Sequence, residues 1–179
     1  MSRRVFLAIN LPERTKNQLA KIQKRFFDWS GRLTKKESLH LTLLFLGYLD
    51  DEQIYSLIGQ LKQIQGLGAF DLRFDQITYG PPGKTPRMIW VSGPENKMLT
   101  ALKNKVEDVV ARGCWHRQNQ QKFTPHITLM RLKNGRPGQL SATKEKIDIT
   151  FPVWSFELME SRLKRSGAEY CILESFSLD

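Results

Sequence analysis

Two short segments of the chain carry the same pattern: a histidine, an apolar residue, a threonine and a leucine. The first is His40-Leu41-Thr42-Leu43, and the second, His126-Ile127-Thr128-Leu129, follows after nearly half the chain length. Side chains alternate between the two faces of a β-strand, so the histidine and threonine of each copy would share one face. Each copy would therefore supply one imidazole and one hydroxyl to a common surface, with its apolar side chains on the opposite face.

These groups suit phosphoryl chemistry. Imidazole titrates near neutral pH, so one neutral and one protonated ring can act together as general base and general acid. Threonine hydroxyls can donate hydrogen bonds to the non-bridging oxygens of a phosphate. A single copy would more often be a structural strand histidine beside a threonine that favours β-structure. Because two of the three histidines in the chain lie in the same pattern, we favour catalysis for the pair.

The surrounding sequence predicts the strands and helices that would hold these groups. Strands are expected at residues 4–9, 39–46 (ended by Gly47), 70–79, 88–91, 123–132, 153–163 and 169–178, with a loop at 80–86 and a turn at 136–138. Helices are expected from Pro12 to Phe26, from a capping box at Asp50 and Gln53 to Ile64, and from Leu99 to Val110. This mixed order favours an α+β fold over a doubly wound sheet.

Composition limits the class of protein. The 179 residues include 28 Lys and Arg against 18 Asp and Glu, a net charge of +10 that favours a polyanionic partner or serves solubility alone. Cys114 and Cys171 lack the spacing of a metal or disulfide framework, so we expect a reducing compartment and no bound metal. The apolar run near the N-terminus is too short for a signal peptide or a membrane span. We expect one cytoplasmic domain, residues 1–179.

The two motifs with their flanks resemble the two-histidine (2H) phosphoesterases, and among them the RNA 2′,3′-cyclic phosphodiesterases, also called 2′-5′ RNA ligases. The resemblance is carried by residues 40–47 and 123–131, with weaker support from residues 4–9 and from Gly167, Tyr170 and Leu173. It implies a bilobal α+β fold with pseudo-two-fold duplicated antiparallel sheets, helices on the outside and a central cleft. It also implies a monomer without cofactors.

The same resemblance implies an activity. The expected reaction is hydrolysis of a terminal 2′,3′-cyclic phosphate of RNA, tRNA fragments included, to a 2′-phosphomonoester. No metal takes part, and the reverse reaction would be 2′-5′ ligation. By resemblance, His40 is the proton donor and His126 the proton acceptor, while Thr42 and Thr128 hold the phosphate.

Four further residues are candidates for substrate binding. Arg131 could bind phosphate, but it lies five positions after His126, which in a regular strand places it on the opposite face. It would reach the cleft only through a bulge or the end of the strand, and the alternative is a structural or solvated arginine. Trp90 could stack a base, although a core tryptophan is the more common case. Phe45 and Phe123 have the same two interpretations.

Basic residues are dense between Arg112 and Lys146, where one acid, Glu145, occurs. This basic run could guide an RNA backbone or form a solvated face. Its members are Arg112, Arg117, Lys122, Arg131, Lys133, Arg136, Lys144 and Lys146. His116 lies within it, and we interpret it as a surface histidine because no further metal ligands have suitable spacing.

Two other functions stay open at the level of sequence. One is a sister phosphodiesterase acting on a small cyclic nucleotide phosphate, which turnover of a cyclic mononucleotide would reveal. The other is a non-catalytic nucleotide- or RNA-binding module, which would bind a ligand without turnover. Two intact histidine–threonine pairs argue against the second, because binding alone does not require two titratable imidazoles.

Overall fold

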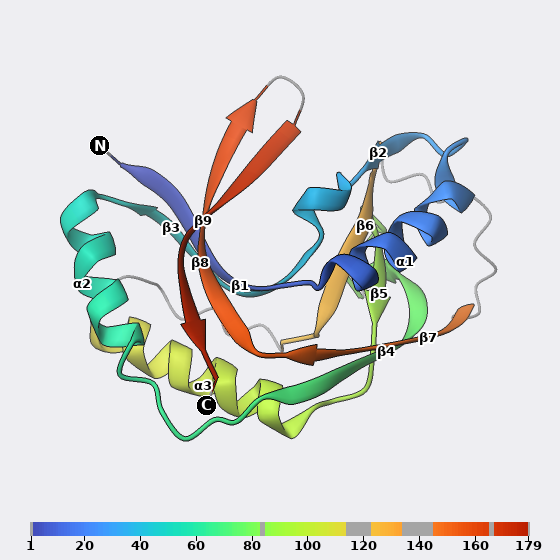
Figure 1. The fold of residues 1–179 in the computed structure, drawn as a ribbon. Coiled ribbons are helices and arrows are strands. Elements are labelled where there is room, and N and C mark those ends of the chain that lie inside the picture. Colours follow the sequence, from blue (N-terminus) through green and yellow to red (C-terminus); the bar gives the residue numbers. More distant parts are fainter. Residues whose placement is uncertain (1, 83–84, 114–122, 134–144, 165–166, 179) are drawn as a thin grey trace.

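The computed structural model describes residues 2–82, 85–113, 123–133, 145–164 and 167–178 (Figure 1). The strands are β1 (Arg3–Asn10), β2 (Gly31–Leu33), β3 (His40–Leu49), β4 (Phe70–Gly80), β5 (Met88–Ser92), β6 (His126–Leu132), β7 (Glu145–Val153), β8 (Ser155–Lys164) and β9 (Gly167–Ser177). The helices are α1 (Glu13–Gln23), α2 (Asp51–Leu61) and α3 (Lys97–Arg112), with short 3-10 helices η1 (Lys24–Phe26) and η2 (Lys36–Ser38).

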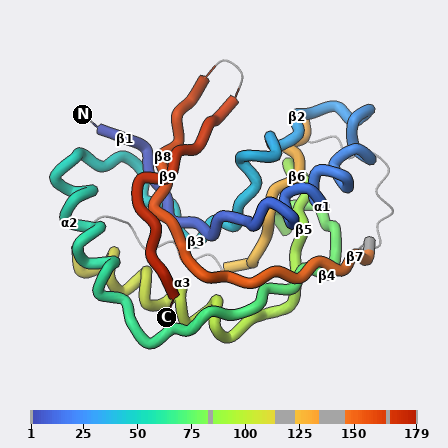
Figure 2. Tube along the Cα trace, viewed as in Figure 1, coloured from blue at the N-terminus to red at the C-terminus, as the bar shows by residue number. Residues whose placement is uncertain are grey.

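The strands form one antiparallel sheet in the order β7-β4-β5-β6-β3-β1-β8-β9, with β2 beside β6. The sheet curls between two groups of four strands, which we call the first half-sheet (β3, β1, β8, β9) and the second half-sheet (β6, β5, β4, β7) (Figure 2). They meet where β3 pairs with β6 through one residue pair, Leu41 and Ile127. The predicted α+β fold with two antiparallel halves is confirmed, and the two motif strands are neighbours at its centre.

The helices lie outside the sheet, on opposite sides of the molecule (Figure 1). α1 packs near β6 of the second half-sheet, where the Gln23 side chain bonds the Leu129 carbonyl. α2 and α3 pack against each other, and α3 contacts β3. The predicted capping box of α2 is present: the Asp50 carboxylate accepts from the Gln53 N–H, and the Gln53 amide oxygen accepts from the Asp50 N–H. Among the described residues, no helix is long and apolar enough to span a membrane.

Both motif strands contain a β-bulge at the same motif position. Between β1 and β3, Ala8 pairs with Thr42 and Leu7 with Leu44, so Leu43 is the extra residue. In β3, Leu43 and Leu44 are consequently buried one after the other.

The bulge of β6 lies at the equivalent motif position. Between β5 and β6, Trp90 pairs with Thr128 and Ile89 with Met130, so Leu129 is the extra residue. A bulge shifts the alternation of faces by one position. The residue five positions after each histidine, Phe45 in β3 and Arg131 in β6, therefore returns to the face of the histidine.

Several predicted boundaries are wrong, and two strands were not predicted. β6 begins at His126 rather than at 123, and α2 ends at Leu61 rather than Ile64. β3 does not end at Gly47 but continues to Leu49, because Gly47 adopts a φ of 83° at a second register shift and pairing then resumes. β2 and β7 were not predicted. The turn predicted at 136–138 lies outside the described residues.

Candidate active site

The two motif imidazoles make the same hydrogen bond at Nδ1, to the backbone carbonyl two residues earlier. The Nδ1 of His40 lies 2.7 Å from the carbonyl oxygen of Ser38, and the Nδ1 of His126 lies 2.7 Å from that of Thr124. A carbonyl can only accept, so we assign the proton of each neutral ring to Nδ1. Each neutral ring then carries its lone pair on Nε2.

The two threonines have different partners. The Thr42 Oγ1 lies 3.0 Å from the Nε2 of His40, and with the proton on Nδ1 this Nε2 accepts from the hydroxyl. The Thr128 Oγ1 lies 4.0 Å from the sulfur of Met88, a weak acceptor, so its hydroxyl is readily available to a stronger one. The Thr42 hydroxyl thus lies beside the imidazole of His40, and the Thr128 hydroxyl lines the same cavity as both histidines.

Aromatic rings hold both histidines in place. The ring of His126 stacks on Trp90, with centroids 3.7 Å apart and planes 20° from parallel. His40 meets the ring of Tyr170 edge-on at 4.9 Å, and Phe6 lies 5.1 Å from it. Trp90 is 6% exposed, so its place in the structure supports the alternative of a core tryptophan rather than a platform for a base.

The surroundings favour the neutral form of both imidazoles. Burial lowers the pKa of His40 to about 4, against the hydrogen bond to Ser38, and the charges of His126, Arg131 and Lys16 lower it further. Burial likewise lowers the pKa of His126, with a smaller contribution from Arg131. Both rings are therefore neutral at pH 7 in the free protein.

A cavity of about 830 Å³ opens onto these groups, and its walls come from both half-sheets. His40, Thr42, His126 and Thr128 all line it. Five cations, and no carboxylate among the described residues, line it as well: Arg4, Arg32, Lys35, Arg131 and Lys164. A cavity with this charge attracts a polyanion, and it is larger than a terminal phosphate requires.

The predicted binding residues do not all reach this cavity. Arg131 lines it because of the bulge at Leu129. A bulge was one of the two conditions under which the sequence allowed Arg131 to reach the cleft. Phe45 also lines it, with 57% of its surface exposed. Phe123 is not among the lining residues, and the ammonium of Lys103 lies 5.1 Å from its ring centroid.

Most of the cations that line the cavity lie outside the basic run that the sequence marked as a candidate for RNA binding. Of the basic run, Arg112, Arg131, Lys133 and Lys146 are described, and Arg131 alone of these four lines the cavity. The other four members and His116 lie outside the described residues. Residues that sequence reasoning missed include Arg4, Arg32, Lys35, Lys164, Phe6 and Tyr170. They are spread over separate elements and share no local pattern that could have revealed them.

Comparison with known proteins gives the same grouping. The chain matches the 2′-5′ RNA ligase superfamily over residues 11–165. A Thermus thermophilus protein named RNA 2′,3′-cyclic phosphodiesterase is 31% identical over 98% of this chain and 90% of its own length. A protein of that name from Methanocaldococcus jannaschii is 30% identical over 73% of this chain and 72% of its own length. Escherichia coli LigT, in complex with 3′-AMP, superposes with a TM-score of 0.85 at 26% identity, covering 99% of both chains. The chain therefore belongs to the 2′-5′ RNA ligase superfamily of two-histidine phosphoesterases.

Proposed function

We propose that the protein hydrolyses the terminal 2′,3′-cyclic phosphate of RNA to a 2′-phosphomonoester, with His40 and His126 as general acid and general base. The observation that carries this proposal is the meeting of two imidazoles and two hydroxyls in one cavity with five cations and no carboxylate among its described lining residues. Relatives named RNA 2′,3′-cyclic phosphodiesterase, and the LigT structure with 3′-AMP, support it.

The proposed reaction needs one proton acceptor and one proton donor. The Nε2 of His126 takes a proton from water, and the water oxygen attacks phosphorus. The bond from phosphorus to the 3′-oxygen breaks, and the Nε2–H of His40 protonates that oxygen. The assignment of roles follows the family resemblance. Ligation would use the same steps and the same roles with a 5′-hydroxyl in place of water, and its reversal, cleavage of a 2′-5′ bond by the 3′-hydroxyl, would exchange the two roles. These side chains supply the acid, the base and the hydrogen-bond donors, so we expect activity in EDTA.

Protonation of His40 would also prepare Thr42 for binding. In the neutral ring the Nε2 accepts from the Thr42 hydroxyl, whereas a protonated Nε2 is itself a donor. The hydroxyl proton is then released to a non-bridging oxygen of the phosphate. On the other side of the cavity, Thr128 and Arg131 offer a second hydroxyl and a guanidinium, which suit the remaining charge of the phosphate.

Product analysis tests the proposal. An RNA oligonucleotide ending in a 2′,3′-cyclic phosphate is incubated with the protein in EDTA, and the product is resolved as a 2′- or a 3′-phosphate. We expect the 2′-phosphate. His126→Ala should lower the rate by about 10²- to 10⁴-fold, the usual contribution of a positioned acid or base.

The control is Thr150→Val, on an exposed position of β7 that is not among the residues lining the cavity, with circular dichroism to verify the fold of each variant. A folded His126→Ala protein that keeps wild-type activity would refute the mechanism. Binding of the RNA without turnover by the wild-type protein would instead favour a binding module.

A further inference from the structure

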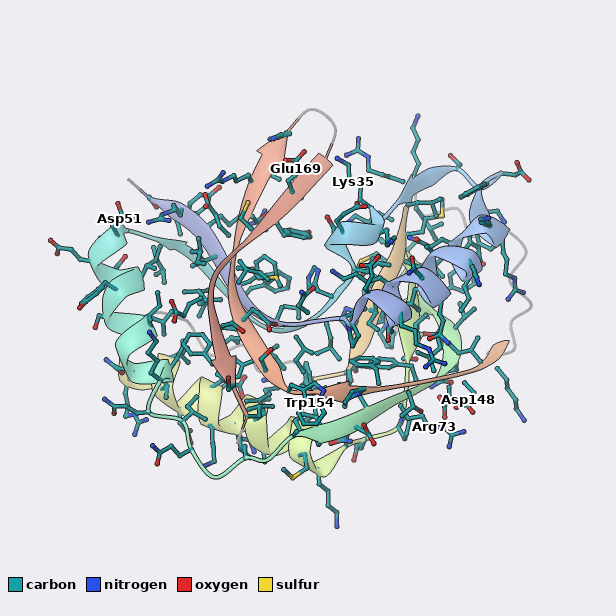
Figure 3. All side chains as sticks on the ribbon, in the orientation of Figure 1. Lys35, Asp51, Arg73, Asp148, Trp154 and Glu169 are labelled. Atoms are coloured by element: carbon teal, nitrogen blue, oxygen red, sulfur yellow. The ribbon has the colours of Figure 1, made fainter. Side chains whose placement is uncertain are left out.

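A three-residue ion cluster spans the mouth of the cavity. Lys35, between β2 and η2, lies on one side, while Lys164 and Glu169 belong to the β8–β9 hairpin on the other. The Nζ of Lys35 lies 3.6 Å from one carboxylate oxygen of Glu169, and the Nζ of Lys164 lies 2.6 Å from the other oxygen. Figure 3 shows Lys35 and Glu169 facing each other across the gap between the hairpin and the β2 segment.

The two lysines belong to the cavity, but the carboxylate does not. Lys35 and Lys164 both line the cavity, whereas Glu169 is not among the lining residues. Within the described part of the chain, Lys35 and Lys164 are the two lining cations that have a carboxylate within ion-pair distance. Arg4, Arg32 and Arg131 therefore face the cavity with no such competitor among the described residues.

Glu169 is ionised, but it is held weakly. The hydrogen bond from Lys164, and then the charges of Lys164 and Lys35, lower the pKa of its carboxyl group. The three side chains are 37–56% exposed, and ion pairs this accessible contribute little to stability. A stronger anion entering from solvent can replace the carboxylate at low cost.

The geometry of the cluster matches an RNA backbone phosphate. A phosphodiester presents two non-bridging oxygens that share one negative charge, as a carboxylate does, and lysine is a common point-charge partner for it. A strand with its terminal phosphate at the histidines would pass both lysines if it leaves the cavity between the β2 segment and the hairpin, where they lie on opposite walls.

The first residue of β9 lies close to the opposite wall. A Cβ placed on Gly167 would be 3.0 Å from a guanidinium nitrogen of Arg32. The mouth is therefore narrow enough for cations of both walls to contact one phosphate.

We propose that Lys35 and Lys164 form a binding site for an internal backbone phosphate of the RNA, and that Glu169 occupies this site in the free protein. The inference rests on the proposed function, which places the 3′ end of the RNA at the two histidines. An oligonucleotide must displace Glu169, whereas a cyclic mononucleotide has no internal phosphate to place there. Glu169 thus weakens binding of longer substrates, and the two lysines favour them.

Binding measurements test the proposal independently of turnover. The dissociation constant of a short, fluorescently labelled RNA ending in a 2′-phosphate is measured by anisotropy over a series of salt concentrations. Glu169→Gln should tighten binding about three- to fivefold, as expected when one exposed competing ion pair is removed. Lys35→Gln and Lys164→Gln should each weaken binding and lower the slope of log Kd against log salt by about 0.7, the value for one phosphate contact on a single strand.

The matched controls come from a similar ion pair between the C-terminal end of α2 and β9. Lys62 and Glu174 are 2.9 Å apart, with comparable exposure, and neither lines the cavity. Lys62→Gln and Glu174→Gln should leave the affinity and the salt slope unchanged.

Two results would overturn the proposal. One is a Glu169→Gln protein whose affinity for the RNA is unchanged or weaker. The other is lysine variants in which the binding of 2′-AMP is weakened as much as the binding of the oligonucleotide. A wild-type protein that binds the RNA as described but hydrolyses no cyclic phosphate would remove the proposed function and leave this binding site standing.

Discussion

The proposed acid and base are both neutral in the free protein, which determines how activity should depend on pH. Burial lowers the pKa of His40 to about 4 and brings the pKa of His126 below its ordinary value near 6.5. The reaction requires one ring protonated and the other neutral, so kcat/KM should rise through the lower pKa and fall through the higher one. We expect its maximum below pH 6.5.

The profile of kcat should differ from that of kcat/KM. A bound phosphodiester places a negative charge beside both rings, which favours their protonated forms and raises both pKa values. Because kcat reports the pKa values of the complex, its optimum should lie at a higher pH. Both profiles can be measured with a cyclic-phosphate oligonucleotide between pH 4 and 9 at constant ionic strength. A kcat/KM optimum above pH 7 would contradict the neutral pair.

At the scale of elements, the bulge in β6 is hydrogen-bonded to a glutamine of α1. Gln23 is 5% exposed, and its Nε2 donates to the carbonyl oxygens of Thr34 and Leu129, both at 2.8 Å. The Leu129 carbonyl also accepts from the N–H of Thr34 at 2.9 Å. The helix, the β2–η2 segment and the extra residue of the bulge are thus joined by one side chain.

Replacing this side chain should affect both stability and binding. Gln23→Leu leaves the Thr34 carbonyl without its donor, which should cost about 1–3 kcal/mol of unfolding free energy. It should also raise KM, because the bulge directs Arg131 into the cavity. Urea unfolding and steady-state kinetics measure the two effects. Gln18→Leu, at an exposed position of the same helix, should change stability by less than about 0.5 kcal/mol. Equal effects of the two substitutions would exclude this role for Gln23.

The sequence predicts an element well when the residues that cause it to form are neighbours along the chain. The motif strands and the three helices follow from apolar periodicity, and the capping box from two residues. Strand β7 carries a local signal of the same kind, the alternation of Ile147, Ile149, Phe151 and Val153. β2, with three residues, has no periodicity to detect and depends on its partner β6.

The site was predicted only where its residues repeat along the chain. The two His-x-Thr pairs could be found because the pattern occurs twice, and the position of Arg131 could be stated as conditional on a bulge. No local signal places Tyr170 beside His40, or Lys35 opposite Lys164. These contacts arise from the order in which distant strands pair, and a single sequence carries no direct information on that order.

At the scale of the whole molecule, the first half-sheet is built from both ends of the chain, with the whole second half-sheet between them in sequence. β1 and β3 begin the first half-sheet, β4 to β7 build the second, and β8 and β9 return to complete the first. One large buried cluster contains residues of both halves, such as Leu41, Ile127 and Phe156. We therefore expect the halves to unfold together.

Equilibrium unfolding in urea tests this expectation. Far-UV circular dichroism reports the strands and helices of both halves, and tryptophan fluorescence includes Trp90, buried in the second half-sheet. Coincident transitions with one midpoint are expected for a cooperative unit of this size. Two separated transitions would show that the half-sheets are independent.

The paired bulges have a consequence for stereochemistry. If the two motif strands were equivalent, a cyclic phosphate could bind in either of two orientations, and exchanging the orientations would exchange the 2′- and 3′-oxygens as leaving group. The structure breaks this equivalence five residues after each histidine, where β3 carries the exposed ring of Phe45 and β6 the guanidinium of Arg131. A nucleobase favours the first and a phosphate the second. Regioselectivity would then depend on this pair of unequal side chains.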